Sequence, residues 1–321
     1  MTYHVLIPDS VHPFALDVFK STPELRVTAQ GQMQRAETLS TVASADALII
    51  RSATKVDAEM LSAAMHLRAI ARAGVGVDNV DIKTATANGV VVMNTPDGNT
   101  IATAEQTFAL MLALARHVPQ AYLSMRDGKW DRKSYMGTEL RGKTLGVVGF
   151  GRIGRAVAKR ALAFEMTVIA YDPYIPLDIA ADLGVDLVSL DDIYRRSDYI
   201  TLHMVLTDET REMIRSENIA KMKSGVRIIN AARGALINEA DLAEAVKSGQ
   251  VAGAALDVYA QEPPPANHPL IGLPGVVHTP HLAASTEEAQ VAVAVEAAQL
   301  IVEGLLKGKW HNVVNPEVLQ A

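Results

Sequence analysis

The sequence has no cysteine, and aromatic residues make up only 5% of its 321 residues. Without cysteine, disulfides, thiolate nucleophiles and zinc–thiolate sites are excluded. Hydrophobic residues make up 49% and charged residues 21%, which is the balance of a globular protein rather than of a disordered one. A chain of this length exceeds one ordinary hydrophobic core, so we expect two domains.

Basic clusters, a signal peptide and long apolar runs are also missing. The formal net charge is -6, the isoelectric point is near 5.9, and basic residues do not cluster, so we expect no nucleic-acid partner. The opening MTYHVLIPDS lacks both the basic start and the apolar core of a signal peptide. No uncharged apolar run reaches the roughly eighteen residues that cross a bilayer. We therefore expect a cytoplasmic protein with no membrane partner.

Short apolar runs alternate with longer helical patterns along almost the whole chain. The runs are nearly continuously apolar, which is typical of strands buried on both faces of a parallel sheet. This alternation predicts an α/β protein made of two doubly wound parallel-sheet domains. The predicted strands are residues 4–9, 25–28, 47–52, 67–74, 90–95, 144–150, 167–172, 185–188, 199–204, 227–232, 253–258 and 276–280.

Two long helical patterns stand between and after these runs. Residues 103–125 predict one helix, and Thr103 begins a capping-box spacing at its start. The second helix follows Ser285, which begins the same spacing, and it should end near Gly308.

A glycine pattern after the sixth predicted strand indicates a dinucleotide site. Gly149, Gly151 and Gly154 form G-x-G-x-x-G between an apolar run and an amphipathic helical pattern. The first glycine permits a tight turn, the second lets backbone approach a pyrophosphate, and the third lets helix pack closely on strand. Asp172 ends the next strand, where a carboxylate accepts hydrogen bonds from both ribose hydroxyls and repels a 2′-phosphate. The pattern predicts NAD rather than NADP; the alternative is a glycine-rich turn with a surface aspartate.

Three polar residues follow later predicted strands: Arg233, Glu262 and His281. The carboxyl ends of parallel strands converge on one ligand crevice. Transfer of a hydride from an alcohol needs a base for the hydroxyl proton, a group that tunes the base, and a cation for an anionic substrate. These residues meet those needs. Each also has a structural alternative, as a surface cation, a loop carboxylate and a helix-entry residue.

Several ordered motifs resemble one family over nearly the whole chain. GFGRIG, YDPY, NAARGALIN, GAALDVYAQEPP and TPHLAASTEEAQ are similar to motifs of the D-2-hydroxyacid dehydrogenases that act on D-isomers. The resemblance implies that His281 is the acid/base, that Glu262 favours its protonated form, and that Arg233 binds the substrate carboxylate. It places Asp257 near the nicotinamide. It also implies NAD contacts by Arg152 and Ile153 at the pyrophosphate and by Ala231 and Ala284 at the nicotinamide end.

The resemblance also implies the domain organisation. Residues 98–285 would form a Rossmann NAD-binding domain, and residues 1–97 with 286–321 a discontinuous, flavodoxin-like substrate domain. The active site would lie in the cleft between these domains. The family forms dimers partly through the helix after residue 100, so we expect a homodimer.

Two arginines bear on the substrate. Arg51 and Arg72 follow strands of the N-terminal domain, and a guanidinium suits phosphate because it offers paired donors in one plane. The motifs are most similar to those of family members that oxidise 3-phospho-D-glycerate with NAD to 3-phosphohydroxypyruvate, the entry to serine synthesis. In those members both arginines hold the phosphate, and backbone near Ser52 and Gly74 meets the carboxylate. A third cation would come from Arg132 or Lys133.

Other interpretations remain open at this stage. Arg51 and Arg72 could be ordinary strand-end ion-pair partners, as in a hydroxypyruvate or glyoxylate reductase of the same fold. An NAD-sensing binding protein related to corepressors is a further alternative. His278 and His281 lie on an extended stretch without a suitably spaced carboxylate, so we expect no metal site.

The sequence departs from the usual family pattern at a few places. Val205 replaces a proline near the adenosine pocket, and Ala283 and Val75 replace residues near the nicotinamide. His203 is expected to be a strand-end residue on the adenosine side. Because the chain ends at Ala321, we expect a member without the regulatory domain that many relatives carry.

Overall fold

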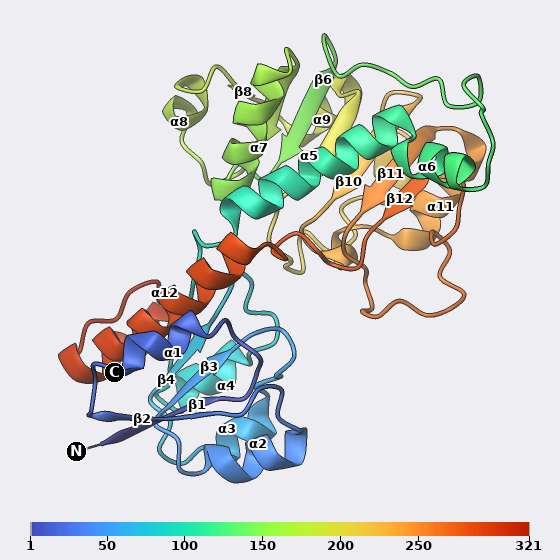
Figure 1. The fold of residues 1–321 in the computed structure, drawn as a ribbon. Coiled ribbons are helices and arrows are strands. Elements are labelled where there is room, and N and C mark those ends of the chain that lie inside the picture. The colour runs from blue at the N-terminus through green and yellow to red at the C-terminus, as the bar shows by residue number, and fades with distance from the viewer. Residues whose placement is uncertain (1, 321) are drawn as a thin grey trace. The chain divides into compact units, whose positions relative to one another are not determined.

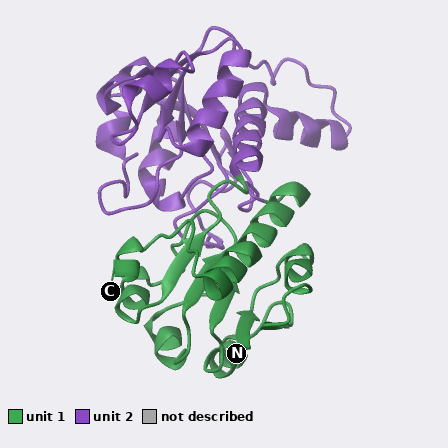
Figure 2. Ribbon diagram, turned by 90° about the vertical axis from the view of Figure 1, so that its left-hand side faces the viewer, with its two compact units in different colours: residues 1–99, 285–321 green, residues 100–284 purple. Residues whose placement is uncertain are grey.

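The structure is a computed structural model and describes residues 2–320. The chain divides into two compact units (Figure 2). Unit 1 comprises Met1–Asn99 and Ser285–Ala321, and unit 2 comprises Thr100–Ala284. Unit 1 is therefore discontinuous in sequence, whereas unit 2 is one continuous segment.

In unit 1, the described residues form a five-stranded sheet in the order β2-β1-β3-β4-β5, and every strand pair is parallel (Figure 1). This is the strand order of flavodoxin-like folds, and the order reverses between β1 and β3. The strands are β1 (Tyr3–Ile7), β2 (Leu25–Ala29), β3 (Ala47–Ile50), β4 (Ala69–Arg72) and β5 (Val91–Asn94), and the helices are α1 (Phe14–Phe19), α2 (Arg35–Val42), α3 (Ala58–Ala63), α4 (Ile82–Ala87) and α12 (Glu287–Lys307).

Alternate residues of the unit 1 strands supply two cores, one on each face of the sheet. Val5 and Ile7 pack with α1 and α12, whereas Leu6 packs with α2, α3 and α4. The two faces explain why these strands are apolar at successive positions, since neither side meets water. Each fully buried aliphatic side chain of this kind contributes about 1.5–3 kcal/mol.

In unit 2, the described residues form a seven-stranded parallel sheet in the order β12-β11-β10-β9-β6-β7-β8. This is a Rossmann order, and it reverses between β6 and β9. The strands are β6 (Thr144–Val148), β7 (Thr167–Tyr171), β8 (Asp186–Leu187), β9 (Tyr199–Leu202), β10 (Val226–Asn230), β11 (Val251–Leu256) and β12 (Val276–His278), and the helices are α5 (Thr100–Arg116), α6 (Val118–Arg126), α7 (Arg152–Ala163), α8 (Leu177–Ala181), α9 (Leu190–Arg196), α10 (Ser216–Ile219) and α11 (Glu239–Ser248).

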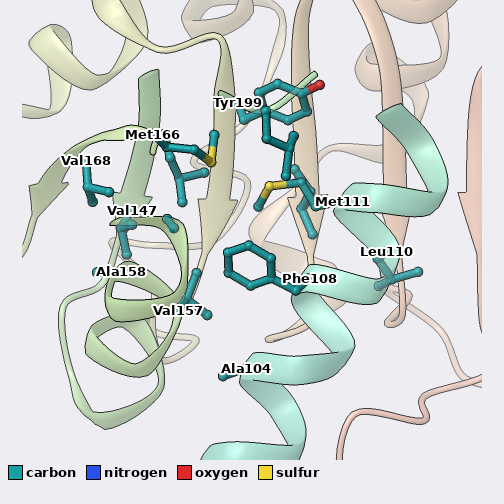
Figure 3. Close-up of a cluster of buried hydrophobic side chains, with 14 of the residues drawn as sticks. Ala104, Phe108, Leu110, Met111, Val147, Val157, Ala158, Met166, Val168 and Tyr199 are labelled. Atoms are coloured by element: carbon teal, nitrogen blue, oxygen red, sulfur yellow. The ribbon is translucent and has the colours of Figure 1, made fainter. Parts of the chain in front are cut away.

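Helices α5 and α7 cover one face of the unit 2 sheet. Phe108 and Met111 of α5 point toward Val147 of β6 and Val157 of α7 in the buried cluster shown in Figure 3. A second cluster on the opposite face includes buried residues of α9, α10 and α11. The predicted α/β class with two doubly wound parallel sheets is confirmed, and each of the predicted strand runs contains a strand.

The predicted helix over 103–125 was wrong in its extent. The segment is two helices, α5 and α6, separated by His117 at φ 52°. Thr103 lies inside α5 rather than capping it. The break has a local cause, because Pro119 lacks an N–H and constrains the residue before it, so the second helix starts afresh with proline in its first turn.

Helix α12 begins one residue later than predicted. Thr286, not Ser285, is its N-cap, since the Thr286 hydroxyl accepts a hydrogen bond from Ala289 N at 3.2 Å. Its end at Gly308, with φ 64°, is as predicted. By length and composition α12 is long and apolar enough to cross a membrane. Its buried residues, such as Val293, Ala297 and Ile301, belong to the core of unit 1.

Candidate active site

The glycine-rich loop connects β6 to α7 at the point where the unit 2 sheet order reverses. Gly149 has φ 94°, and a Cβ on it would lie 2.6 Å from the carbonyl carbon of His203, in the loop after β9. A Cβ on Gly154 would lie 2.0 Å from the Gly149 carbonyl oxygen. These two glycines therefore allow the close packing of β6, β9 and α7.

Gly151 differs from the other two glycines. Apart from Gly151 itself and its two chain neighbours, no protein atom of the described chain lies within 4 Å of the position that its Cβ would take. Gly151 is the N-cap of α7, so the space beside it faces the amide groups at the helix start, where Arg152 and Ile153 are the first residues. An open cradle at a helix N-terminus suits a pyrophosphate, and the residues present therefore fit NAD.

Asp172 lies beside this loop at the end of β7. Its Oδ2 accepts a hydrogen bond from Phe150 N at 2.8 Å, and its Oδ1 accepts one from Tyr174 N at 2.9 Å. These bonds fix the carboxylate against the glycine-rich turn. It remains partly exposed and can accept further hydrogen bonds, as a ribose requires.

His281 and Glu262 form a hydrogen-bonded pair. The distance from His281 Nδ1 to Glu262 Oε2 is 2.7 Å, and Glu262 Oε1 accepts from Tyr259 N at 3.1 Å. Because a carboxylate can only accept, Nδ1 carries the proton and Nε2 is the ring nitrogen that can exchange a proton with a substrate. Burial acts to raise the pKa of Glu262, but the hydrogen bonds from His281 and Tyr259 N, with the charges of His281 and Arg233, hold this pKa below its usual range.

Asp257 holds the loop that carries His281. Its carboxylate is completely buried and accepts hydrogen bonds from Thr279 Oγ1 at 2.5 Å and from Leu282 N and Ala283 N at 2.8 Å. The Asp257 carbonyl oxygen accepts from His281 N at 2.8 Å. Asp257 was predicted from family resemblance to lie near the nicotinamide; in this structure its carboxylate binds three groups of the His281 loop.

The Arg233 loop packs directly on the backbone that leads to Glu262. A Cβ on Gly234 would lie 1.9 Å from the Tyr259 carbonyl carbon, so only glycine fits here. The Arg233 carbonyl accepts from Asn230 Nδ2 at 2.9 Å, which fixes the turn after β10. Since β10, β11 and β12 are neighbours in the sheet, the three predicted catalytic residues come together at one end of unit 2.

An apolar cavity of about 330 Å³ adjoins the His281–Glu262 pair. Sequence reasoning missed Tyr259 in its wall, whose hydroxyl donates to the Thr279 carbonyl at 3.1 Å. Burial raises the pKa of Tyr259 to about 12. No periodic signal marks this residue, because its partner is 20 residues away in the chain.

The two remaining NAD-end candidates lie near this group in the chain. Ala231 is buried after β10, and Ala284 is the last residue of unit 2, just after the His281 loop. His203 directly follows β9, its Nε2 lies 3.0 Å from Thr201 Oγ1, and burial lowers its pKa to about 3. Within residues 2–320 there is no cluster of three or more metal-binding side chains.

Unit 1 brings its predicted substrate residues together at the carboxyl ends of β3 and β4. Arg51 follows β3, and Arg72, the last residue of β4, pairs in register with Ile50. A Cβ on Gly74 would lie 1.6 Å from Arg72 Nη1, so the guanidinium folds over this glycine. Ser52 is exposed beside Arg51. Burial lowers the pKa of Arg51, an effect that the charge of Asp9 opposes.

The predicted third cation belongs to the other unit. Arg132 and Lys133 lie in the exposed segment after α6, in unit 2. There the carboxylate of Asp131 accepts a hydrogen bond from Lys133 N at 3.2 Å.

Comparison with known proteins identifies the family. Residues 108–283 match the family model described as "D-isomer specific 2-hydroxyacid dehydrogenase, NAD binding domain". The chain is 51% identical over 312 residues to a D-3-phosphoglycerate dehydrogenase of Archaeoglobus fulgidus, and 48% identical over 312 residues to one of Methanocaldococcus jannaschii. Both alignments cover 97% of this chain but only 59% of the relative, so the chain spans about three-fifths of their length.

Solved structures of similar proteins match nearly the whole chain. The TT0316 protein of Thermus thermophilus has a TM-score of 0.88 at 37% identity, covering 97% of this chain and 99% of that one. A glyoxylate reductase from Paecilomyes thermophila has a TM-score of 0.89 at 30% identity, with coverage of 98% and 99%. The chain belongs to the D-isomer specific 2-hydroxyacid dehydrogenase family, whose cofactor is NAD, and the segment that matches the family's NAD-binding domain lies within unit 2.

Proposed function

We propose that this chain oxidises 3-phospho-D-glycerate to 3-phosphohydroxypyruvate with NAD, the first step of serine synthesis. The observation that carries the chemistry is the 2.7 Å hydrogen bond between His281 Nδ1 and Glu262 Oε2. The substrate assignment is supported by several relatives named D-3-phosphoglycerate dehydrogenase at 46–51% identity. It also rests on the two arginines at the carboxyl ends of β3 and β4.

The reaction removes a proton from the C2 hydroxyl and a hydride from C2. When bound, NAD accepts the hydride. His281 Nε2 takes the hydroxyl proton, and the Glu262 carboxylate stabilises the resulting imidazolium through Nδ1. Arg233 holds the substrate carboxylate and polarises the C2 oxygen, so that the C–O bond develops double-bond character as the hydride leaves.

The proposal assigns the phosphate to unit 1, the proposed substrate-binding unit. Arg51 and Arg72 would each offer paired donors to the phosphate oxygens, and the backbone near Ser52 and Gly74 would meet the carboxylate. The Asp172 carboxylate would accept hydrogen bonds from both ribose hydroxyls of NAD and would repel the extra phosphate of NADP.

Nicotinamide absorbance with purified protein tests the whole proposal. We expect turnover of 3-phospho-D-glycerate with NAD to exceed turnover of D-glycerate and D-lactate, and turnover with NADP to be much slower. Activity confined to unphosphorylated acids would replace the substrate while leaving the chemistry in place. Glyoxylate and hydroxypyruvate, each with NADH, should then be tested as substrates, because the chain is similar to a glyoxylate reductase.

We also propose a cytoplasmic homodimer. Helix α6 and the segment after it expose large apolar side chains, including Tyr122 at 67%, Trp130 at 77% and Met136 at 82%. Covering such side chains favours association. Light scattering after gel filtration should give twice the monomer mass, and Trp130→Ser with Tyr122→Ser should shift it toward the monomer. Cell fractionation tests the location.

A further inference from the structure

Two residues outside the predicted site, Asp9 and Asn79, hold the Arg51 loop at both of its ends. The loop consists of residues 51–54 and follows β3. Asp9 follows β1, so the two segments meet where the strand order of the unit 1 sheet reverses. In doubly wound sheets this is the position at which ligands bind.

Asp9 accepts the N–H groups of the loop ends. Its Oδ2 accepts from Arg51 N at 2.5 Å and from Thr54 N at 3.3 Å. Its Oδ1 accepts from Thr54 Oγ1 at 2.5 Å. Asp9 is only 2% exposed. These hydrogen-bond donors offset the cost of burying its negative charge.

Asn79 binds the carbonyl groups of the same two residues. Its Nδ2 donates to Arg51 O at 2.7 Å and to Thr54 O at 2.6 Å. Asn79 is itself anchored, because its backbone carbonyl accepts from Val56 N at 2.8 Å. The Asp9 carboxylate therefore accepts hydrogen bonds from both N–H groups at the loop ends, and the Asn79 amide donates hydrogen bonds to both C=O groups.

This double fixation leaves the tip of the loop to solvent. Ser52 and Ala53 are exposed, and their amide N–H groups donate to no protein acceptor within residues 2–320. The Arg51 side chain starts from a fixed backbone, and its Nη1 lies 3.5 Å from the Ser10 carbonyl, next to Asp9. The loop thus presents a guanidinium and two backbone donors in one place, a combination that suits a phosphate or carboxylate.

We propose that Asp9 and Asn79 are positioning residues that determine the preference for a phosphorylated substrate by fixing the Arg51 loop. This inference rests on the proposed function. The two residues touch the loop rather than the substrate, so their loss should weaken anion binding while leaving NAD binding and proton transfer in unit 2 unchanged. Precise placement matters here because a misplacement of about 1 Å costs a large part of a charge-assisted contact.

The test compares Asp9→Asn, Asn79→Ala and the milder Thr54→Val with wild type and with Arg51→Ala. Asp9→Asn keeps the shape but removes the negative charge, so a neutral amide oxygen accepts more weakly from the two N–H groups even when the amide NH2 faces the Thr54 hydroxyl. Thr54→Val removes one hydrogen bond at constant size. Asn315→Ala is the matched control. Asn315 is fully buried and its side chain makes three hydrogen bonds, but its backbone partners are Val90 and Val92 at the amino end of β5.

The first readout is the ratio of kcat/KM for 3-phospho-D-glycerate to that for D-glycerate. We expect Asp9→Asn and Asn79→Ala to lower this ratio at least about threefold, mainly through KM, with kcat within about threefold. The drop should be smaller than for Arg51→Ala, because the backbone near Ser52 would also meet the carboxylate that both acids carry. Thr54→Val should lower the ratio less. Asn315→Ala should leave the kcat/KM ratio unchanged, even if its melting temperature falls as far as that of Asp9→Asn or Asn79→Ala. A ratio unchanged in the Asp9 and Asn79 variants, or lowered equally in Asn315→Ala, overturns the inference.

The second readout separates this inference from the proposed function. Binding of inorganic phosphate is measured by calorimetry for the same folded variants. If wild type shows no preference for the phosphorylated acid, the proposed substrate is wrong. The positioning role still stands in that case if inorganic phosphate binds wild type but binds neither Asp9→Asn nor Asn79→Ala. If phosphate does not bind wild type either, the positioning role fails as well. If Asp9→Asn does not fold, Asn79→Ala and Thr54→Val decide.

Discussion

Replacing either of two glycines of the glycine-rich loop by alanine should impair a different property: stability at Gly154 and NAD binding at Gly151. A Cβ on Gly154 would lie 2.0 Å from the Gly149 carbonyl oxygen, whereas a Cβ on Gly151 would meet no protein atom within 4 Å. Gly154→Ala must therefore push α7 away from β6. Gly151→Ala requires no rearrangement of protein, because its φ of −69° is also available to alanine.

The expected magnitudes follow from these contacts. Overpacking of the Gly154 kind costs about 1–3 kcal/mol, which lowers the melting temperature by about 2–4 °C per kcal/mol in a domain of this size. At Gly151, alanine is a poorer N-cap by about 0.5–1 kcal/mol, but it also restricts the unfolded chain, which returns about 0.4–1 kcal/mol. The net change in the free energy of unfolding should be within about 1 kcal/mol.

Measuring NAD affinity as well as stability should distinguish the two variants. The methyl group of Gly151→Ala would occupy the space that a pyrophosphate needs, so we expect the Kd for NAD to rise at least about tenfold, or about 1.4 kcal/mol. Urea denaturation without NAD gives the stability, and calorimetry gives the affinity. Wild-type affinity in Gly151→Ala would refute the placement of the pyrophosphate beside this residue. Wild-type stability in Gly154→Ala would refute the packing argument.

Three further perturbations have defined outcomes. His281→Ala should abolish turnover, because no base then faces the C2 hydroxyl, while NAD titration gives a near-normal Kd; retained turnover would contradict the assigned role. Arg51→Ala should raise the KM for 3-phospho-D-glycerate at least about tenfold more than that for D-glycerate, and equal effects in steady-state kinetics would argue against a phosphate site. Burial lowers the pKa of His203 from 6.5 to about 3, so the unfolded chain binds this proton first and stability is lost as pH falls below 6.5. The loss is up to about 1.4 kcal/mol per pH unit, and His203→Gln should flatten urea-denaturation stability against pH by that amount; an identical slope would show that His203 does not carry it.

The elements of the fold that depend on local pattern could be predicted from the sequence. Strands buried on both faces are continuously apolar, and the twelve predicted runs each contain one strand. The glycine motif was recognisable because its function requires small residues at fixed spacing between a strand and a helix. The His117 break was missed because the apolar helical stripe continues across it, although Pro119 was a local signal.

Contacts between distant loops could not be predicted in this way. Residues 262 and 281 pair because β11 and β12 are neighbours in the sheet. The spacing of 19 residues gives no sign of that, and only the family resemblance implied it. Asp9 and Arg51 are 42 residues apart, and a single aspartate after a strand resembles any loop residue. Hydrogen bonds of this kind depend on tertiary arrangement, which leaves no periodic trace in sequence.

The return of the chain into unit 1 has a consequence for how the protein is made. During synthesis, residues 1–99 emerge first, but the side of their sheet that receives Val293, Ala297 and Ile301 stays exposed until α12 has been translated. The continuous segment 100–284 can complete its own core earlier. Unit 2 can therefore complete its core before unit 1, although residues 1–99 come earlier in the sequence, and the apolar sheet face of residues 1–99 is the surface that a nascent-chain chaperone would need to shield.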